Sequence, residues 1–192
     1  MRTGEIDILI VPGWSNSGPD HWQSRWERNL KTARRIEQDD WFAPDKDRWV
    51  GRIVEAVACA TRPVVVVAHS LGVAAVAHAA QKLPRGSIAG AFLVGPADVD
   101  NAHAWPATNG HTWLQSHGDF APAPLERLPF PTRLIGSSND PYCTVERVHQ
   151  LASAWGSDLS IIANAGHINS ESGHGPWPEG LLTFGVFLKQ LG

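Results

Sequence analysis

The sequence lacks the features that mark several classes of protein. Its two cysteines, Cys59 and Cys143, are too few for a disulfide framework and lack zinc-ligand spacing, so we interpret them as reduced thiols of a cytoplasmic protein. No apolar run approaches the roughly 20 residues of a membrane span, and the first residues do not resemble a signal peptide. No basic run is longer than Arg34-Arg35, and the formal net charge is −3. We therefore expect neither a membrane nor a nucleic-acid partner.

What remains is the composition of an ordinary folded protein. The 192 residues are 43% hydrophobic and 18% charged, and the sequence contains nine tryptophans beside one tyrosine and one methionine. A chain of this length buries roughly 70% of the surface that its unfolded form exposes. We expect residues 1–192 to form a single domain.

Short apolar runs alternate with segments of helical periodicity. The predicted strands are residues 6–11, 64–68, 88–94, 132–137 and 159–163, with 34–38 as a weaker sixth. The predicted helices are residues 20–31, where Asp20 and Gln23 resemble a capping box, and 48–60, 71–83, 144–155 and 179–191. Because connections of helix length join the strands, this order predicts an α/β fold with a mainly parallel sheet of about six strands and helices on both faces.

Residues 97–130 interrupt this alternation. They contain four prolines, three histidines and two tryptophans without clear periodicity, so we interpret them as an excursion over one edge of the sheet and not as a separate domain. A short helix near Trp113 is expected there. Trp105 and Trp113 are candidates for a partial lid.

The most informative stretch is Ala68-His69-Ser70-Leu71-Gly72, between a β-branched run and an alanine-rich helix. It matches the nucleophile elbow G-x-S-x-G, with alanine at the first small position. Such a turn exposes the serine hydroxyl at the carboxyl edge of the sheet and places the backbone N–H of Leu71 as an oxyanion donor. A serine between strand and helix can also be a simple N-cap, and this alternative remains open.

The acid and the base of a catalytic triad are expected after later strands. Asp140 follows the strand at 132–137, where it could instead only cap the next helix, and Asp98 is a competing acid at the same edge. His167 follows the last strand, and His174 is its competitor in a Gly/Pro-rich stretch. After the first strand, the backbone N–H of Trp14 is a candidate second oxyanion donor, although Pro12-Gly13 could be an ordinary turn.

These motifs resemble those of a known family. Pro12-Gly13-Trp14, Ser17-Gly18-Pro19-Asp20-His21-Trp22-Gln23, His69-Ser70-Leu71-Gly72, Ser138-Asn139-Asp140-Pro141-Tyr142 and Gly166-His167-Ile168-Asn169 are similar to motifs of small α/β-hydrolases with little or no cap. This is the serine hydrolase family that includes the retinoblastoma-binding serine hydrolase and bacterial YdeN-like proteins. The resemblance implies a compact α/β-hydrolase fold with Ser70 as nucleophile, Asp140 as acid and His167 as base. The L-x-C-x-E pattern used in retinoblastoma binding is absent, so that partner is not carried over.

The predicted function is hydrolysis of an ester, thioester or amide through an acyl-enzyme on Ser70, with a small-molecule acyl substrate and neither metal nor organic cofactor. The alternative is a catalytically silent binding protein of the same fold. A nucleotide-binding enzyme is disfavoured, because no G-x-G-x-x-G or Walker sequence follows a strand. Trp22 and Trp26 are expected on a core helix face, whereas Trp14 and Trp177 are candidates to line the acyl pocket.

Overall fold

Six parallel strands form the centre of the computed structural model, which describes residues 1–106 and 119–192. The sheet has the order β2-β1-β3-β4-β5-β6. Its strands are β1 (Asp7–Val11), β2 (Ala33–Arg35), β3 (Val64–Ser70), β4 (Gly90–Pro96), β5 (Thr132–Ser137) and β6 (Asp158–Ile162). All six predicted strands are present, and the weakest prediction, 34–38, corresponds to the three-residue strand β2 at one edge.

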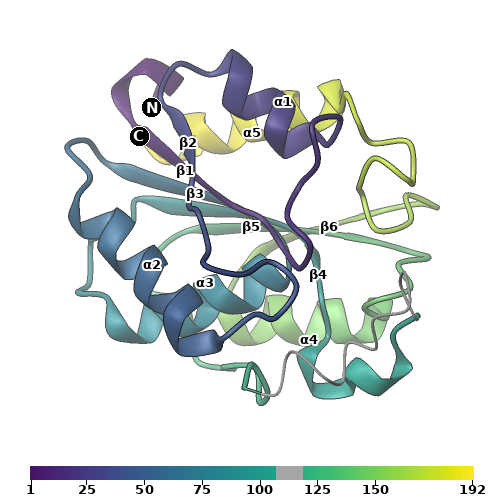
Figure 1. The fold of residues 1–192 in the computed structure, drawn as a ribbon. Helices are drawn as coiled ribbons and strands as arrows, with labels where there is room; N and C mark the ends of the chain where they lie inside the picture. Colours follow the sequence, from purple (N-terminus) through teal and green to yellow (C-terminus); the bar gives the residue numbers. More distant parts are fainter. Residues whose placement is uncertain (107–118) are drawn as a thin grey trace.

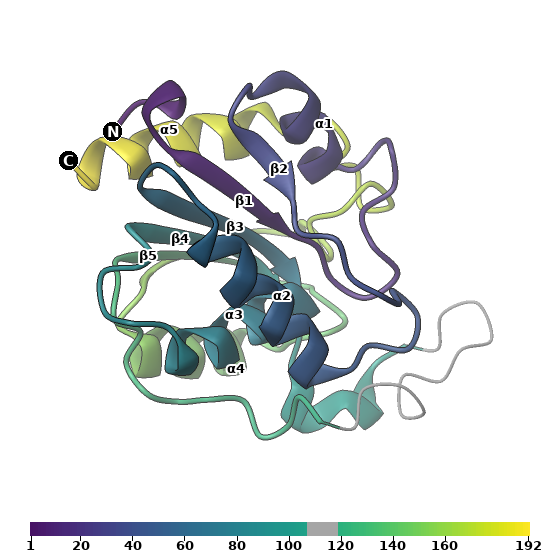
Figure 2. The ribbon, with the colours of Figure 1, turned by 60° about the vertical axis from the view of Figure 1, so that its left-hand side comes forward.

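Helices cover both faces of this sheet (Figures 1 and 2). On one face lie α1 (Trp22–Asn29) and α5 (Pro178–Gln190), and on the other lie α2 (Lys46–Ala58), α3 (Leu71–Lys82) and α4 (Val145–Trp155). The two ends of the chain lie close together, since the Met1 amino group donates to the carbonyl of Leu188 at 2.8 Å. This is the fold predicted from the alternation of strands and helices.

The central strand β3 divides the core in two. Val64 and Val66 pack with α2, α3 and α4, whereas Val65 and Val67 pack with α1 and α5. All four side chains are at most 2% exposed, as expected of a β-branched strand that is covered on both faces. Trp22 and Trp26 belong to the second cluster, which confirms their placement on a core helix face.

The strand order reverses between β1 and β3. From β1 the chain moves outward to β2 at one edge, and from β3 it moves outward through β4 and β5 to β6 at the other. In an open α/β sheet, the loops at such a reversal separate at the carboxyl ends of the strands and leave a crevice where ligands bind. The loops that follow β1 and β3 are therefore the expected walls of a site.

The predicted capping box at Asp20 and Gln23 is wrong. The N-cap of α1 is His21, whose Nδ1 accepts a hydrogen bond from the Gln23 backbone N–H, and Asp20 pairs with Arg25 at 2.9 Å. The Gln23 side chain is fully buried and its amide donates to the carbonyl oxygens of Val11 and Val67. It therefore links the end of β1 to the middle of β3 instead of capping its own helix.

The excursion at 97–130 is described in part. It begins with the short 3-10 segment Val99–Ala104 after β4, and the expected helix near Trp113 lies outside the described residues. Within residues 1–106 and 119–192, this 3-10 segment is the one helical element between β4 and β5, in agreement with a small hydrolase fold without a cap.

Candidate active site

Ser70 lies on a sharp turn between β3 and α3. Its backbone has φ 56° and ψ −128°, a region that non-glycine residues rarely adopt and that costs about 1–3 kcal/mol. Its side chain makes no capping hydrogen bond to α3, so the simple N-cap alternative does not describe it. The turn also explains Gly72, because a Cβ there would lie 2.5 Å from the carbonyl oxygens of both Val11 and Pro12.

The structure brings Ser70, His167 and Asp140 together. The distance from Ser70 Oγ to His167 Nε2 is 2.9 Å, and His167 Nδ1 lies 2.9 Å from each carboxylate oxygen of Asp140. The Asp140 side chain is 1% exposed and that of His167 is 9% exposed. Since the Asp140 carboxylate accepts from Nδ1–H, Nε2 is left as the acceptor of the Ser70 hydroxyl proton.

The competing residues make hydrogen bonds to other partners. Asp98 accepts from Arg147 Nε at 3.1 Å, and His174 Nδ1 lies 3.2 Å from Ser172 Oγ. The N-cap of α4 is Thr144, whose hydroxyl accepts from the Arg147 backbone N–H, so Asp140 does not cap that helix.

The loop that carries His167 is fixed by polar residues at and just after the end of β5. Its backbone N–H groups at 164, 165 and 166 donate to Ser138 Oγ, Ser137 Oγ and Asn139 Oδ1 respectively. Ile168, a β-branched residue, has a positive φ of 49°. Such a conformation persists only where the surroundings over-determine it. These bonds therefore hold the imidazole in place, a role that sequence reasoning did not assign to Ser137, Ser138 or Asn139.

The loop after β1 approaches the nucleophile closely. A Cβ on residue 13 would lie 3.0 Å from Ser70 Oγ and 3.1 Å from the backbone nitrogen of Leu71. Only a glycine, Gly13, permits this approach without displacing the serine. The residue that follows, Trp14, donates from its indole Nε1–H to the carbonyl of Phe42 at 3.0 Å.

These residues border a cavity of about 310 Å³. Its aromatic walls are Trp14, Phe42, Trp105 and Tyr142. Tyr142 packs against the His167 ring at a centroid distance of 4.4 Å, and burial raises the pKa of its hydroxyl. The placement of Trp14 in a pocket wall is confirmed. That of Trp177 is wrong, because Trp177 packs against Trp22 and Trp26 in the core.

Two buried histidines belong to the same cavity and were missed in the sequence. His69 donates from Nε2–H to the carbonyl of His167 at 2.8 Å, and its ring contacts that of His21 at a centroid distance of 4.9 Å. Burial, reinforced by the nearby His167, lowers the pKa of His69 well below its usual value and that of His21 to about 3. Both imidazoles are therefore neutral at physiological pH. Their positions beside Ser70 and Trp22 were visible in the sequence, but the contact between them was not.

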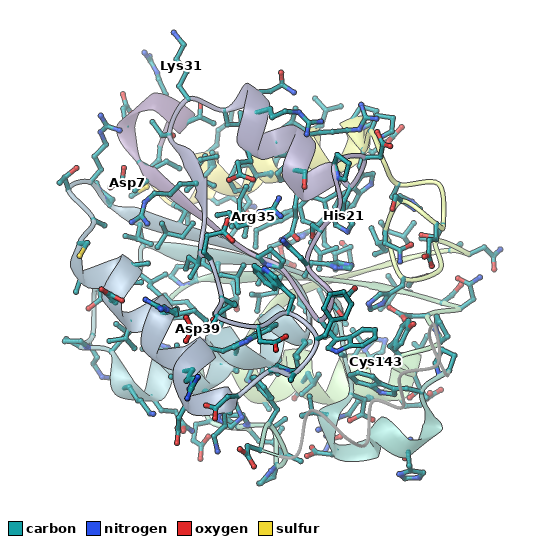
Figure 3. The ribbon with its side chains drawn as sticks, viewed as in Figure 1. Asp7, His21, Lys31, Arg35, Asp39 and Cys143 are labelled. Carbon is teal, nitrogen blue, oxygen red and sulfur yellow. The ribbon has the colours of Figure 1, made fainter. Side chains whose placement is uncertain are left out.

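Arg35 anchors the loop between β1 and α1 from the edge strand β2 (Figure 3). Its guanidinium donates to Asn16 Oδ1, Ser17 O and Ser24 Oγ and pairs with Glu27. Ser15 and Asn16 have positive φ values of 63° and 65°. The hydrogen bonds from Arg35 therefore stabilise a strained loop that forms one wall of the cavity.

Metal-ligand clusters, apolar helices and thiols were also considered among the described residues. Within residues 1–106 and 119–192, no three His, Cys, Asp or Glu side chains gather in a way that could hold a metal ion. No helix in these ranges has the length and apolar character needed to cross a membrane. Cys59 is exposed and Cys143 is buried, and both are free thiols. Burial raises the pKa of Cys143 to about 12, so this thiol is a poor nucleophile.

The fold and the serine at the elbow between β3 and α3 define the class of α/β-hydrolases. The serine hydrolase family profile matches residues 8–185, and the chain belongs to that family. A protein from Pectobacterium atrosepticum described as a YdeN-like hydrolase is 34% identical, with a TM-score of 0.81 over 98% of this chain and 94% of its own.

More distant structures share the fold. The ydeN gene product of Bacillus subtilis is 16% identical, with a TM-score of 0.69 over 95% of this chain and 96% of its own. An esterase from Rhodococcus sp. ECU1013 is 14% identical, with a TM-score of 0.68 over 100% and 93% of the two chains. A search of curated proteins finds no match.

Proposed function

We propose that this chain hydrolyses an ester, thioester or amide bond of a small-molecule acyl substrate through an acyl-enzyme on Ser70. The observation that carries the proposal is the continuous hydrogen-bonded series from Ser70 Oγ through the His167 imidazole to the Asp140 carboxylate, at distances of 2.9 Å. Membership of the serine hydrolase family supports it.

In this mechanism His167 accepts the hydroxyl proton as Ser70 Oγ forms a bond to the substrate carbonyl carbon. Asp140 holds the imidazole in the required tautomer and stabilises the imidazolium. When the tetrahedral intermediate collapses, the bond to the leaving group breaks and His167 returns the proton to that group. Water, activated by His167, then attacks the acyl-enzyme and releases the acid and free Ser70.

The oxyanion would be bound by the backbone N–H groups of Leu71 and Trp14. Support comes from the position of Leu71 at the start of α3, where N–H groups lack helical partners, and from the close approach of Gly13 to Ser70. Where one such donor has been removed from other enzymes, the loss is about 3–4 kcal/mol of transition-state stabilisation. We place this reaction in the cytoplasm and expect it to need no cofactor.

The test is hydrolysis of p-nitrophenyl acetate by the Ser70→Ala variant. Its rate should fall to that of buffer, whereas Ser153→Ala, which changes an exposed serine of α4, should retain the rate of the unaltered protein. Equal activity of Ser70→Ala and Ser153→Ala would refute the proposal. Inactivity of the unaltered protein on all esters, thioesters and amides would favour a silent binding protein.

A further inference from the structure

His21 presents an unused hydrogen-bond donor at the cavity that contains Ser70. The residue is 5% exposed and lines this cavity. Its Nδ1 accepts from the Gln23 backbone N–H, so the proton of the neutral ring is on Nε2. Within residues 1–106 and 119–192, Nε2 makes no hydrogen bond to protein, yet it is not among the fully buried unpaired polar atoms, so it is accessible from the cavity.

The direction of this donor follows from what surrounds the ring. The Nδ1 edge faces the backbone of α1, and the ring contacts Trp22 and His69 at centroid distances of 5.4 and 4.9 Å. The Nε2 edge is the polar edge left to face the cavity. When a bound substrate covers the cavity, this N–H loses its access to water, and leaving it without an acceptor is then unfavourable.

We propose that His21 Nε2–H donates a hydrogen bond to a neutral oxygen of the bound substrate, outside the scissile carbonyl. This inference rests on the proposed hydrolase function and adds a substrate class to it: esters or amides that carry a second acceptor oxygen, such as an ether, hydroxyl, ester or amide oxygen. His21 is in this view a specificity-determining residue.

The charges around the cavity favour a neutral acceptor over a carboxylate. Among the described residues that line it, none is lysine or arginine, and the one formally charged side chain is the carboxylate of Glu171. His21 and His69 are both neutral, since burial lowers the pKa of each. A substrate carboxylate would therefore be desolvated in a cavity whose described lining has no cationic side chain and includes the carboxylate of Glu171.

Hydrogen-bonding sites of this kind discriminate between substrates that differ by one oxygen. A site built to bond a substrate oxygen rejects an analogue that lacks it, because its own buried donor is then left unpaired. A purely apolar pocket distinguishes the same two substrates weakly.

The test compares each ester with an analogue in which an oxygen replaces one CH₂ group. In one series of analogues the oxygen is moved along the acyl chain, and in a second series it is moved along the alcohol. Rates are followed by pH-stat, and each kcat/KM is divided by the rate of hydroxide-catalysed hydrolysis of the same ester. The unaltered protein should prefer the oxygen-containing ester at one or two positions by about tenfold. If the preference occurs in the acyl series, the acyl part of the substrate is the partner of His21. If it occurs in the alcohol series, the alcohol part is.

Two substitutions separate the two nitrogens of His21. Asparagine places an acceptor near the position of Nδ1 and is a good N-cap, and its NH2 group does not reach the position of Nε2, so His21→Asn retains the helix cap but has no donor at that position. Glutamine places its amide near the position of Nε2, so His21→Gln retains a donor but caps poorly. His21→Asn should lose the roughly tenfold preference with little change in Tm, and His21→Gln should keep most of the preference despite a lower Tm.

The outcomes are distinct. Ester hydrolysis without an oxygen preference at any position, or with the same preference in His21→Asn, overturns the role of His21 and leaves the hydrolase function intact. Absence of hydrolysis by the unaltered protein overturns both. Loss of the preference in His21→Gln but not in His21→Asn would assign it to the helix cap and also contradict the inference.

Discussion

Gly72→Ala tests the packing on which the elbow depends. Gly72 is the second residue of α3, and a Cβ at this position would lie 2.5 Å from the carbonyl oxygens of Val11 and Pro12. Ordinary contacts of a Cβ begin near 3.4 Å, so α3 and the end of β1 must separate by the better part of an ångström. Both contacting atoms belong to the backbone, and no side-chain rotation can relieve them.

The expected loss follows from this overlap. Overpacking of a well-packed site costs about 1–3 kcal/mol, and the better helix propensity of alanine offsets somewhat less than 1 kcal/mol of it. For a chain of this size, each kcal/mol lowers Tm by about 2–4 °C. Because Pro12 precedes Gly13 and Trp14, the same displacement moves the loop next to Ser70, and kcat/KM should fall at least about tenfold, which is 1.4 kcal/mol of barrier.

The assays are urea unfolding and ester hydrolysis, with Gly51→Ala as the matched control. Gly51 is an exposed residue inside α2, and a Cβ at this position would have no neighbouring atom within 4 Å outside its own helix backbone. Alanine there should therefore stabilise the fold by about 0.5–1 kcal/mol without affecting activity. If Gly72→Ala matches or exceeds Gly51→Ala in both stability and activity, the steric reasoning about the elbow is refuted.

Two further predictions concern the acids and the histidines. Asp140→Asn should lower kcat/KM by about 10⁴-fold because the imidazole tautomer is lost. Asp98→Asn, which weakens the ion pair with Arg147, should lower the free energy of unfolding by about 1–3 kcal/mol and change kcat/KM little. A lower kcat/KM in Asp98→Asn than in Asp140→Asn would contradict the assignment of Asp140 as the acid. Below pH 6.5 the unfolded state binds a proton at His21 and His69 that the folded state does not, since their folded pKa values are lowered. As the pH is lowered, the free energy of unfolding should therefore decrease by about 1.4 kcal/mol per pH unit for each histidine. Urea unfolding at several pH values between 5.5 and 4 gives the slope of the free energy of unfolding against pH. This slope should be about 1.4 kcal/mol per pH unit smaller in His21→Asn than in the unaltered protein. An unchanged slope would show that His21 is not buried as a neutral ring.

Much of the fold could be predicted from local pattern. The run Val64 to Val67 indicates a strand covered on both faces, and Ala74, Ala75, Ala77 and Ala79 allow α3 to approach the sheet closely. The short edge strand Ala33–Arg35 gave a weak signal, because an edge strand of three residues shows little alternation.

Contacts between residues far apart in the sequence could not be predicted. Asp20 and Gln23 have the spacing of a capping box, but the Gln23 amide donates to the carbonyl groups of Val11 in β1 and Val67 in β3, and local propensity cannot reveal such partners. Position along the chain did not distinguish Asp140 from Asp98 either, since both follow strands at the same edge, and Asp140 was favoured only by the resemblance of its motif. The ion pair of Asp98 with Arg147 is a contact over 49 positions that only the fold brings together. The same holds for His21 and His69, which are separated by α1, β2 and α2.

The identity of the nucleophile can be tested most directly by the mass of the intact protein after reaction with a fluorophosphonate. We expect a single phosphonyl adduct on the unaltered protein, located on Ser70 by peptide mapping, and no adduct on Ser70→Ala under the same conditions. An adduct on another residue, or equal labelling of the two proteins, would contradict a covalent mechanism that proceeds through Ser70.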